Sequence, residues 1–126
     1  MGKGRRVFLF RTVRGSLAEA LTDRDLASLG DAYVNFVCSL ALSNRRRKPL
    51  GVRDKGSVLA EGLRRARLRD CLGPGMTRHT LADAAEALIG YACPNGHVTL
   101  DECSARAVVA GVSALLTTVK KRVTFL

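Results

Sequence analysis

The sequence predicts an all-α protein, and its periodicity, composition and length support this fold class. Apolar residues recur at helical spacing in several stretches, separated by short runs rich in Gly, Pro or basic residues. Aromatic residues make up 5% of the chain and Trp is absent, so the core must consist of Leu, Val, Ala and Ile, which favours packed helices. A chain of 126 residues suits one domain with its own core. We expect a basic arm over residues 1–14 and a helical domain over 15–126.

The first long helix is expected to begin near Thr22, which can cap it, and to end near Ser43 and Asn44. Asp23 and Asp25 fall in its first turn, where negative charge suits the helix dipole. The basic run from Arg45 to Lys48 is followed by Pro49 and Gly51, which indicates a loop.

Three further helices are predicted at residues 55–69, 80–93 and 99–120. Gly73-Pro74-Gly75 separates the first two, and Pro94-Asn95-Gly96 separates the last two. Thr99 and Glu102 have the spacing of a capping box, which marks the start of the final helix. We expect these helices to pack into a bundle.

The charge balance indicates a polyanionic partner. Lys and Arg total 21 against 11 Asp and Glu, a net charge of +10, and nucleic acid is the leading candidate. Solubility or adaptation to a hot or salty cell would also account for it. The four cysteines form no CxxC pair, and no secretory signal or apolar run of transmembrane length is evident. We expect a cytoplasmic protein with reduced thiols and no membrane association.

Asp31 is an acidic residue within an otherwise apolar helical stretch. Such a carboxylate is unfavourable unless an arginine, backbone donors or a cation satisfies it. Asn35, four residues later on the same face, can place an oxygen beside it. Gly30 is also unexpected, because glycine weakens a helix by about 1 kcal/mol relative to alanine. It suits a place where another helix or a substrate approaches closely.

Asp83 and Glu86 repeat this pattern in the third predicted helix. At i, i+3 spacing they share a face, and two carboxylates facing the same way repel each other. A hard cation such as Mg²⁺ or Mn²⁺ between them removes this repulsion. If the two helices pack together, Asp31 joins the pair. The alternative is that these acids are solvated surface residues.

Two segments resemble the ribonuclease III family. Leu29-Gly30-Asp31-Ala32 resembles the end of that family's signature, and residues 81–90 (LADAAEALIG) resemble its second acidic helix. The Leu-Gly-Pro-Gly run at 72–75 and the helix at 55–68 resemble the intervening elements. The resemblance covers about residues 20–116 with order and spacing preserved, in the form of a compact, archaeal-type homologue without a double-stranded-RNA-binding domain.

The resemblance implies an all-α endonuclease domain that dimerises through its signature helices. It implies that acidic residues hold Mg²⁺, or Mn²⁺, and that double-stranded RNA is hydrolysed. Asp31, Asp83 and Glu86 match three of the family's four acids and become the candidate catalytic and metal-binding residues. The fourth, a glutamate, falls on Ala27, and the signature's first glutamate falls on Arg24. Asp23, one turn before Ala27, is a candidate for compensation.

The function expected is therefore metal-dependent cleavage of double-stranded or structured RNA by a homodimer. The candidate RNA-binding residues are Arg45, Arg46, Arg47, Lys48, Arg64, Arg65 and Arg67, with Lys55 as a further candidate.

Three alternatives remain. The loss of an acid at Ala27 fits a non-catalytic RNA-binding module in RNA processing or ribosome assembly. A structural dimer without a nucleic-acid role fits the basic charge less well. Cys93, His97 and Cys103, with Cys71 or His79, have a loosely zinc-like spacing that matches no standard pattern.

Overall fold

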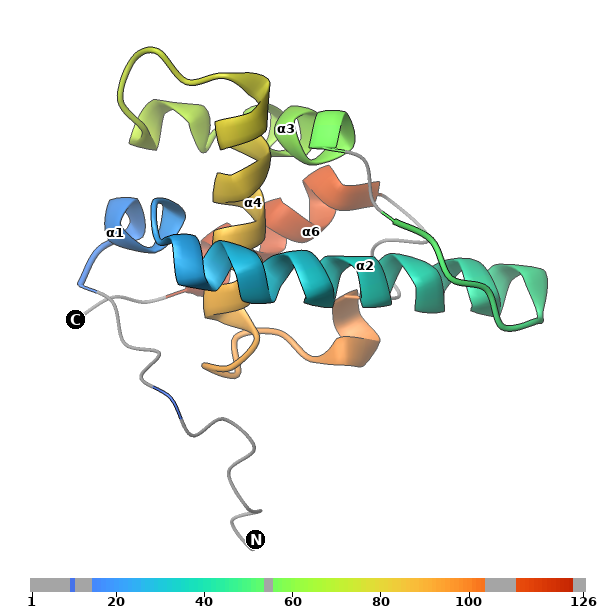
Figure 1. Ribbon diagram of the computed structural model, residues 1–126. Coiled ribbons are helices and arrows are strands. Elements are labelled where there is room, and N and C mark those ends of the chain that lie inside the picture. The colour runs from blue at the N-terminus through green and yellow to red at the C-terminus, as the bar shows by residue number, and fades with distance from the viewer. Residues whose placement is uncertain (1–9, 11–14, 54–55, 104–110, 124–126) are drawn as a thin grey trace, which may run out of the picture.

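The computed structural model describes residues 10, 15–53, 56–103 and 111–123 (Figure 1). Over these residues it is helical and contains no strand, which confirms the predicted fold class. The elements are α1 (Leu17–Leu21), α2 (Arg24–Arg46), α3 (Gly56–Arg65), a 3-10 turn η1 (Arg69–Cys71), α4 (Arg78–Ala92) and α6 (Gly111–Arg122). The predicted basic arm lies outside the described residues, except for Phe10, which is exposed.

Helix α4 is the centre of the fold. It contacts α1, α2, α3 and α6, and every residue from Leu81 to Ala92 is buried except Asp83. Much of this helix is Ala or Gly, so its neighbours can approach its backbone closely. Figure 1 shows α2 lying across α4, with α3 and α6 on the other side of it. The bundle is therefore arranged around one helix of small residues.

Two glycines lie where α2 crosses α4. A Cβ atom added to Gly30 would be 1.8 Å from the backbone oxygen of Glu86, and one added to Gly90 would be 2.3 Å from the backbone oxygen of Leu26. No side chain fits at either place, so the two backbones are in direct contact. The expectation that Gly30 allows a close approach is confirmed, and the partner is a helix of the same chain.

The start of α2 differs from the prediction. Asp23 is the cap, and its Oδ1 accepts a hydrogen bond of 2.9 Å from the backbone N–H of Leu26. Thr22 instead ends α1, a helix that the sequence analysis missed. The spacing of Ser16 and Glu19 could have revealed α1, because the Ser16 hydroxyl accepts from the Glu19 N–H at 3.1 Å, as in a capping box.

The far end of α2 extends two residues beyond the predicted limit, to Arg46. Arg47 then takes the left-handed conformation, with φ of 55°, and the chain turns back along the helix. Hydrogen bonds from the side chains of Ser39 and Ser43 to the backbone of Val52 and Leu50 hold this returning segment. The predicted loop after α2 is thus ordered by two serines.

Two other helix limits are corrected. Helix α3 ends at Arg65 rather than at residue 69, because Arg67 has a φ of 60° and cannot continue a right-handed helix. The Lys120 Nζ donates to the carbonyl oxygen of Ala66 at 3.2 Å, which satisfies an acceptor left at the helix end. Helix α4 begins at Arg78, two residues before Thr80, because Thr77 and Thr80 form its capping box.

The predicted helix over residues 99–120 is not a single helix. The Thr99–Glu102 capping box is present, with both reciprocal hydrogen bonds at 3.1 Å, and residues 100–103 are helical. Gly111, the first residue of α6, has a φ of +81°, so a right-handed helix cannot continue through it and α6 is a separate element. Residues 104–110, within the predicted helix, lie outside the described part of the chain.

Helix α2 is long and apolar enough to cross a membrane by length and composition, with a mean hydropathy of 1.3 in its most apolar window. The expectation that no segment reaches transmembrane length is therefore wrong on these two criteria. Core helices of soluble proteins pass the same test. Here one face of α2 is buried in the bundle, through Leu26, Gly30, Val34, Val37 and Ala41.

At the helix crossing, replacing glycine by alanine should destabilise the protein, although this substitution normally stabilises a helix. Alanine is favoured over glycine in a helix by about 1 kcal/mol, yet Gly30→Ala should lower the free energy of unfolding by about 3 kcal/mol, because its methyl group overlaps the Glu86 carbonyl. Urea denaturation followed by circular dichroism measures the change. Gly56→Ala in α3 is the control, since its Cβ would meet only the Ala82 methyl at 3.7 Å. Equal stability of the two variants would contradict the close crossing.

Candidate active site

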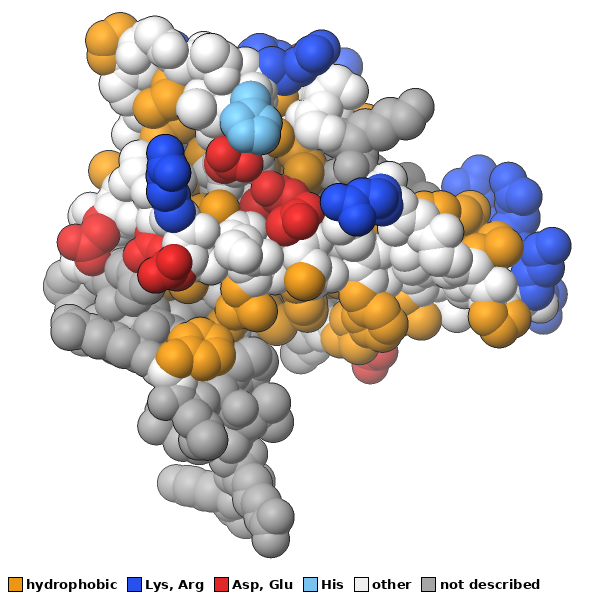
Figure 2. Space-filling model, viewed as in Figure 1, with side chains coloured by type: hydrophobic (Ala, Val, Ile, Leu, Met, Phe, Trp, Pro, Cys, Tyr) orange, Lys and Arg blue, Asp and Glu red, His pale blue; other side chains and the backbone are white. Residues whose placement is uncertain are grey.

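The crossing of α2 and α4 forms one wall of a cleft of about 700 Å³, which we call the acidic cleft. Asp31 and Ala27 line it from α2, and Asp83 and Glu86 line it from α4. Figure 2 shows acidic side chains gathered between these helices, with a histidine beside them. The structure therefore brings together the three acids singled out in the sequence, although more than fifty residues separate Asp31 from Asp83. The end of α1, through Leu21 and Thr22, also lines the cleft.

Asp31 is half-buried on the cleft-facing side of α2, directly after Gly30. The Asn35 Nδ2 donates a hydrogen bond of 3.4 Å to its Oδ1. Asn35 was expected to add an oxygen beside Asp31, but the contact is made by the amide nitrogen. Its effect is to orient the Asp31 carboxylate rather than to supply another ligand.

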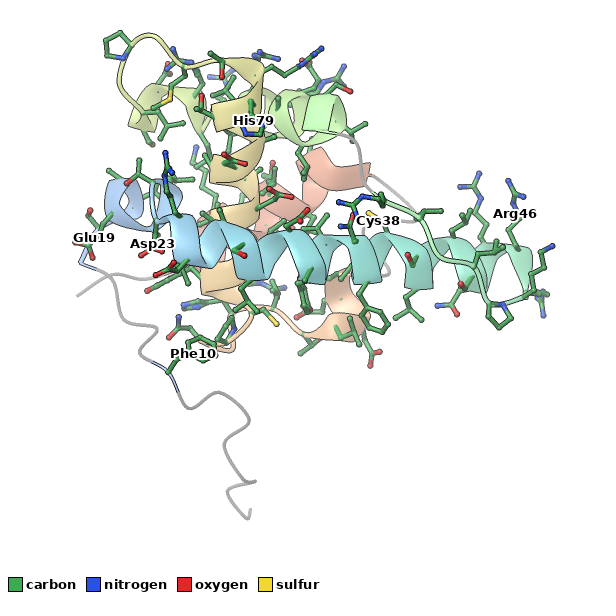
Figure 3. All side chains as sticks on the ribbon, viewed as in Figure 1. Phe10, Glu19, Asp23, Cys38, Arg46 and His79 are labelled. Atoms are coloured by element: carbon green, nitrogen blue, oxygen red, sulfur yellow. The ribbon has the colours of Figure 1, made fainter. Side chains whose placement is uncertain are left out.

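The two acids of α4 differ in exposure. Glu86 is 9% exposed. It is the one charged residue that is buried in the described part of the chain. Asp83, one turn earlier, is half-exposed, and its Oδ2 lies 3.6 Å from the Nε2 of His79. His79 lines the cleft as well and is labelled beside it in Figure 3. The cleft thus runs from a buried carboxylate to a histidine at the surface.

The donor types in the acidic cleft suit a hard divalent cation, because all three candidate ligands offer carboxylate oxygens. As the side chains stand, no three His, Cys, Asp or Glu residues in the described ranges are grouped closely enough to hold an ion. Asp31 and Asp83 are both half-exposed and can adopt other rotamers. The residues therefore fit a metal after side-chain rotation.

Ala27, where the resemblance implies a glutamate, lines the cleft one turn before Asp31 and contributes no oxygen. Asp23 lines the cleft too, but its Oδ1 already accepts from the Leu26 N–H as the helix cap. Because it caps the helix, Asp23 is less able to supply the carboxylate that is absent at position 27. Arg24 places a positive charge in the same cleft.

The predicted RNA-binding residues do not gather at the cleft. The group Arg45, Arg46, Arg47 and Lys48 is exposed at the far end of α2, as the position of Arg46 in Figure 3 shows. Arg64 and Arg65 form surface salt bridges with Glu61, at 3.3 and 3.1 Å. The hydrogen bond from Arg65 is the main reason that the pKa of Glu61 is lowered. Lys55 lies outside the described residues.

The zinc-like set is not assembled within the described residues. Cys103 is fully buried, and the Tyr33 hydroxyl donates to its Sγ at 3.8 Å. Burial raises the pKa of the Cys103 thiol, which disfavours the thiolate that zinc requires, and burial also raises the pKa of Tyr33. His97 stacks on Tyr91, with ring centroids 5.9 Å apart. These residues pack the protein rather than form a metal site.

Comparison with known proteins gives one family. The model of the family described as Ribonuclease III matches residues 24–124, which is most of the chain and includes every residue of α2 and α4. No curated protein matches the sequence.

The position of Ala27 predicts that metal affinity can be increased. Ala27→Glu places a fourth carboxylate in the acidic cleft and should strengthen Mn²⁺ binding by about tenfold, because ligand charge tunes affinity at oxygen sites. Glutamate is nearly as good a helix former as alanine, so the fold should tolerate it. Isothermal titration calorimetry measures the affinity.

Ala18→Glu is the control for added charge, because Ala18 is exposed on α1 and does not line the cleft. A similar gain in both variants would show that net charge, and not a ligand at position 27, determines Mn²⁺ binding.

Proposed function

Because the chain belongs to the ribonuclease III family, we propose that it is a metal-dependent endoribonuclease that hydrolyses phosphodiesters in double-stranded or structured RNA. The observation that carries the proposal is the acidic cleft, where Asp31 of α2 and Asp83 and Glu86 of α4 line one cavity. Carboxylates converging on a cavity from two packed helices are the usual setting for a hydrolytic metal site. The packing of α2 against α4 fixes the backbone positions from which these side chains act.

A divalent ion bound there, Mg²⁺ or Mn²⁺, would supply Lewis-acid stabilisation of the phosphate and lower the pKa of a water molecule. The chain itself provides the positions of the ligands. Glu86 is held by burial, Asp31 is oriented by Asn35, and the Asp83 side chain is half-exposed. A rigid inner ligand and two outer ones that can rotate are suited to receiving a metal together with an RNA phosphate.

RNA binding is proposed to depend on the net charge of +10 and on phosphate contacts rather than on base recognition. Double-stranded RNA is bound mostly through its phosphates and 2′-hydroxyls, so sequence-tolerant binding that weakens steeply with salt is expected. The basic end of α2, at residues 45–48, is exposed and distant from the cleft.

A homodimer is proposed on the free face of α2. Leu29 and Phe36 lie on this helix and are 36% and 53% exposed, and Figure 2 shows hydrophobic side chains along the lower edge of α2. Exposed apolar side chains grouped along one helix suit a protein interface. A two-fold axis would bring two identical clefts to one duplex, as cutting both strands requires. Gly30 does not contribute to this argument, because its contact is with α4 of the same chain.

A non-catalytic RNA-binding module is the second candidate. The observation that favours it is Ala27, which lines the acidic cleft without a carboxylate where the resemblance implies a glutamate. The basic charge serves this function equally well. Under this alternative, RNA would bind with the same salt dependence and remain intact.

Incubation with long double-stranded RNA separates the two candidates. We expect cleavage with Mg²⁺ or Mn²⁺ and none with EDTA, and we expect Asp31→Asn to reduce the rate at least about 100-fold, because it weakens a metal ligand. Asp70→Asn, at an exposed position in η1, is the control and should cleave normally. A mobility shift without cleavage under either metal would reject the nuclease and favour the binding module.

The dimer has its own test. Phe36→Asp places a charge on the exposed face of α2 and should convert a dimer into a monomer of 13.6 kDa at micromolar concentration. Light scattering after size-exclusion chromatography measures the mass. Val58→Asp, on an exposed site of α3, should leave the dimer intact. A wild-type protein that is monomeric at all concentrations would exclude this interface.

A further inference from the structure

An arginine lies within the acidic cleft. Arg24, the first residue of α2, lines the same cavity as Asp31, Asp83 and Glu86. Its side chain is exposed and makes no salt bridge or hydrogen bond with any residue in the described part of the chain. A guanidinium that shares a cavity with carboxylates can pair with one of them. It is therefore available to an anion that enters the cleft.

Stability does not explain the position of Arg24. The first turn of a helix carries a partial positive charge, so a cation there is unfavourable, and residues such as Asp25 are preferred. The charge of Arg24 opposes the dipole of the longest helix in the structure. A positive group held against this local preference suggests a role in binding.

The cleft-facing residues of α2 divide the cavity by charge. Arg24, Ala27 and Asp31 are spaced i, i+3 and i+7, so they follow one face of the helix, and all three line the cleft. Seven residues of helix rise about 10 Å, which leaves room for a phosphodiester between the guanidinium and the Asp31 carboxylate. The Asp31 end offers oxygens to a cation, whereas the Arg24 guanidinium at the other end offers hydrogen-bond donors to an anion. Asp23, beside Arg24, also lines the cleft, but its Oδ1 accepts from the Leu26 N–H as the helix cap.

We propose that Arg24 binds the phosphodiester held in the acidic cleft. Its positive charge takes the place of a second divalent ion, which would need an acid at position 27 as a ligand. The inference rests on the proposed function. Guanidinium groups bind phosphate with two parallel hydrogen bonds and stabilise the charge that develops on it during hydrolysis. Asp31, Asp83 and Glu86 suit one divalent ion per chain, and the arginine takes the place of the second. The fourth carboxylate that lines the cleft, Asp23, is engaged in capping α2.

Arg24→Gln tests the inference, because it should change the affinities for Mn²⁺ and for RNA in opposite directions. Removal of the positive charge should strengthen Mn²⁺ binding by about twofold to fivefold, since like charges in the cleft no longer repel. The same change should weaken binding of a short RNA duplex in EDTA by about tenfold, since a charged hydrogen-bond donor to phosphate is lost. Calorimetry measures the first affinity and its stoichiometry, and fluorescence anisotropy measures the second.

Matched variants make the result specific. Lys121→Gln removes one exposed positive charge from α6, away from the cleft, and should change neither affinity by more than about twofold. Arg24→Lys keeps the charge but loses the two-pronged donor, so it should bind Mn²⁺ as the wild type does and bind RNA with intermediate affinity. Thermal melting by circular dichroism checks that each variant is folded.

The outcomes separate this inference from the proposed function. Two Mn²⁺ ions per wild-type chain, or an RNA affinity unchanged in folded Arg24→Gln, would overturn the role of Arg24 while leaving the nuclease in place. A wild-type protein that binds no Mn²⁺ and cuts no RNA would reject the nuclease. A loss of RNA affinity in Arg24→Gln with a gain in Mn²⁺ affinity supports the inference.

Discussion

The contact between the backbones of α2 and α4 is the constraint on which the structure depends. Glycine at positions 30 and 90 lets the Glu86 and Leu26 carbonyls reach the opposite helix, where a methyl group would overlap them. Each contact has an immediate chemical consequence, because Asp31 follows Gly30 and Glu86 is itself the residue touched. The same packing that fixes the centre of the bundle therefore places carboxylates from distant parts of the sequence beside one cavity. Stability and candidate chemistry share these atoms.

The distribution of charge gives the cleft its character. The protein is strongly basic overall, with a net charge of +10, yet the cleft at the helix crossing is lined by Asp31, Asp83 and Glu86. A basic surface attracts a polyanion, and an acidic centre binds it only if a cation or an arginine is present. Arg24, and alanine rather than glutamate at position 27, make this centre less negative than it would otherwise be.

Much of this could be predicted from the sequence, because it depended on local patterns. Helical spacing placed α2, α3 and α4, and three unexpected acids on apolar helices located the cleft. Features that depend on which of two neighbouring side chains caps a helix were not predicted. Asp23 rather than Thr22 caps α2, because α1 already uses Thr22. Left-handed residues at Arg67 and Gly111 ended or divided predicted helices, and periodicity does not reveal such backbone conformations. The distance between the basic end of α2 and the cleft follows only from the direction of the helix.

The central claim is that one metal ion is bound jointly by α2 and α4, and paramagnetic broadening of amide NMR signals tests it most directly. In ¹⁵N-labelled protein, substoichiometric Mn²⁺ should broaden the amide signals of residues 27–31 and 82–87 together, before any others. These are the stretches that meet at the crossing and carry Asp31, Asp83 and Glu86. Broadening confined to one of the two helices, or centred on the cysteine region around Cys93 and Cys103, would contradict the account.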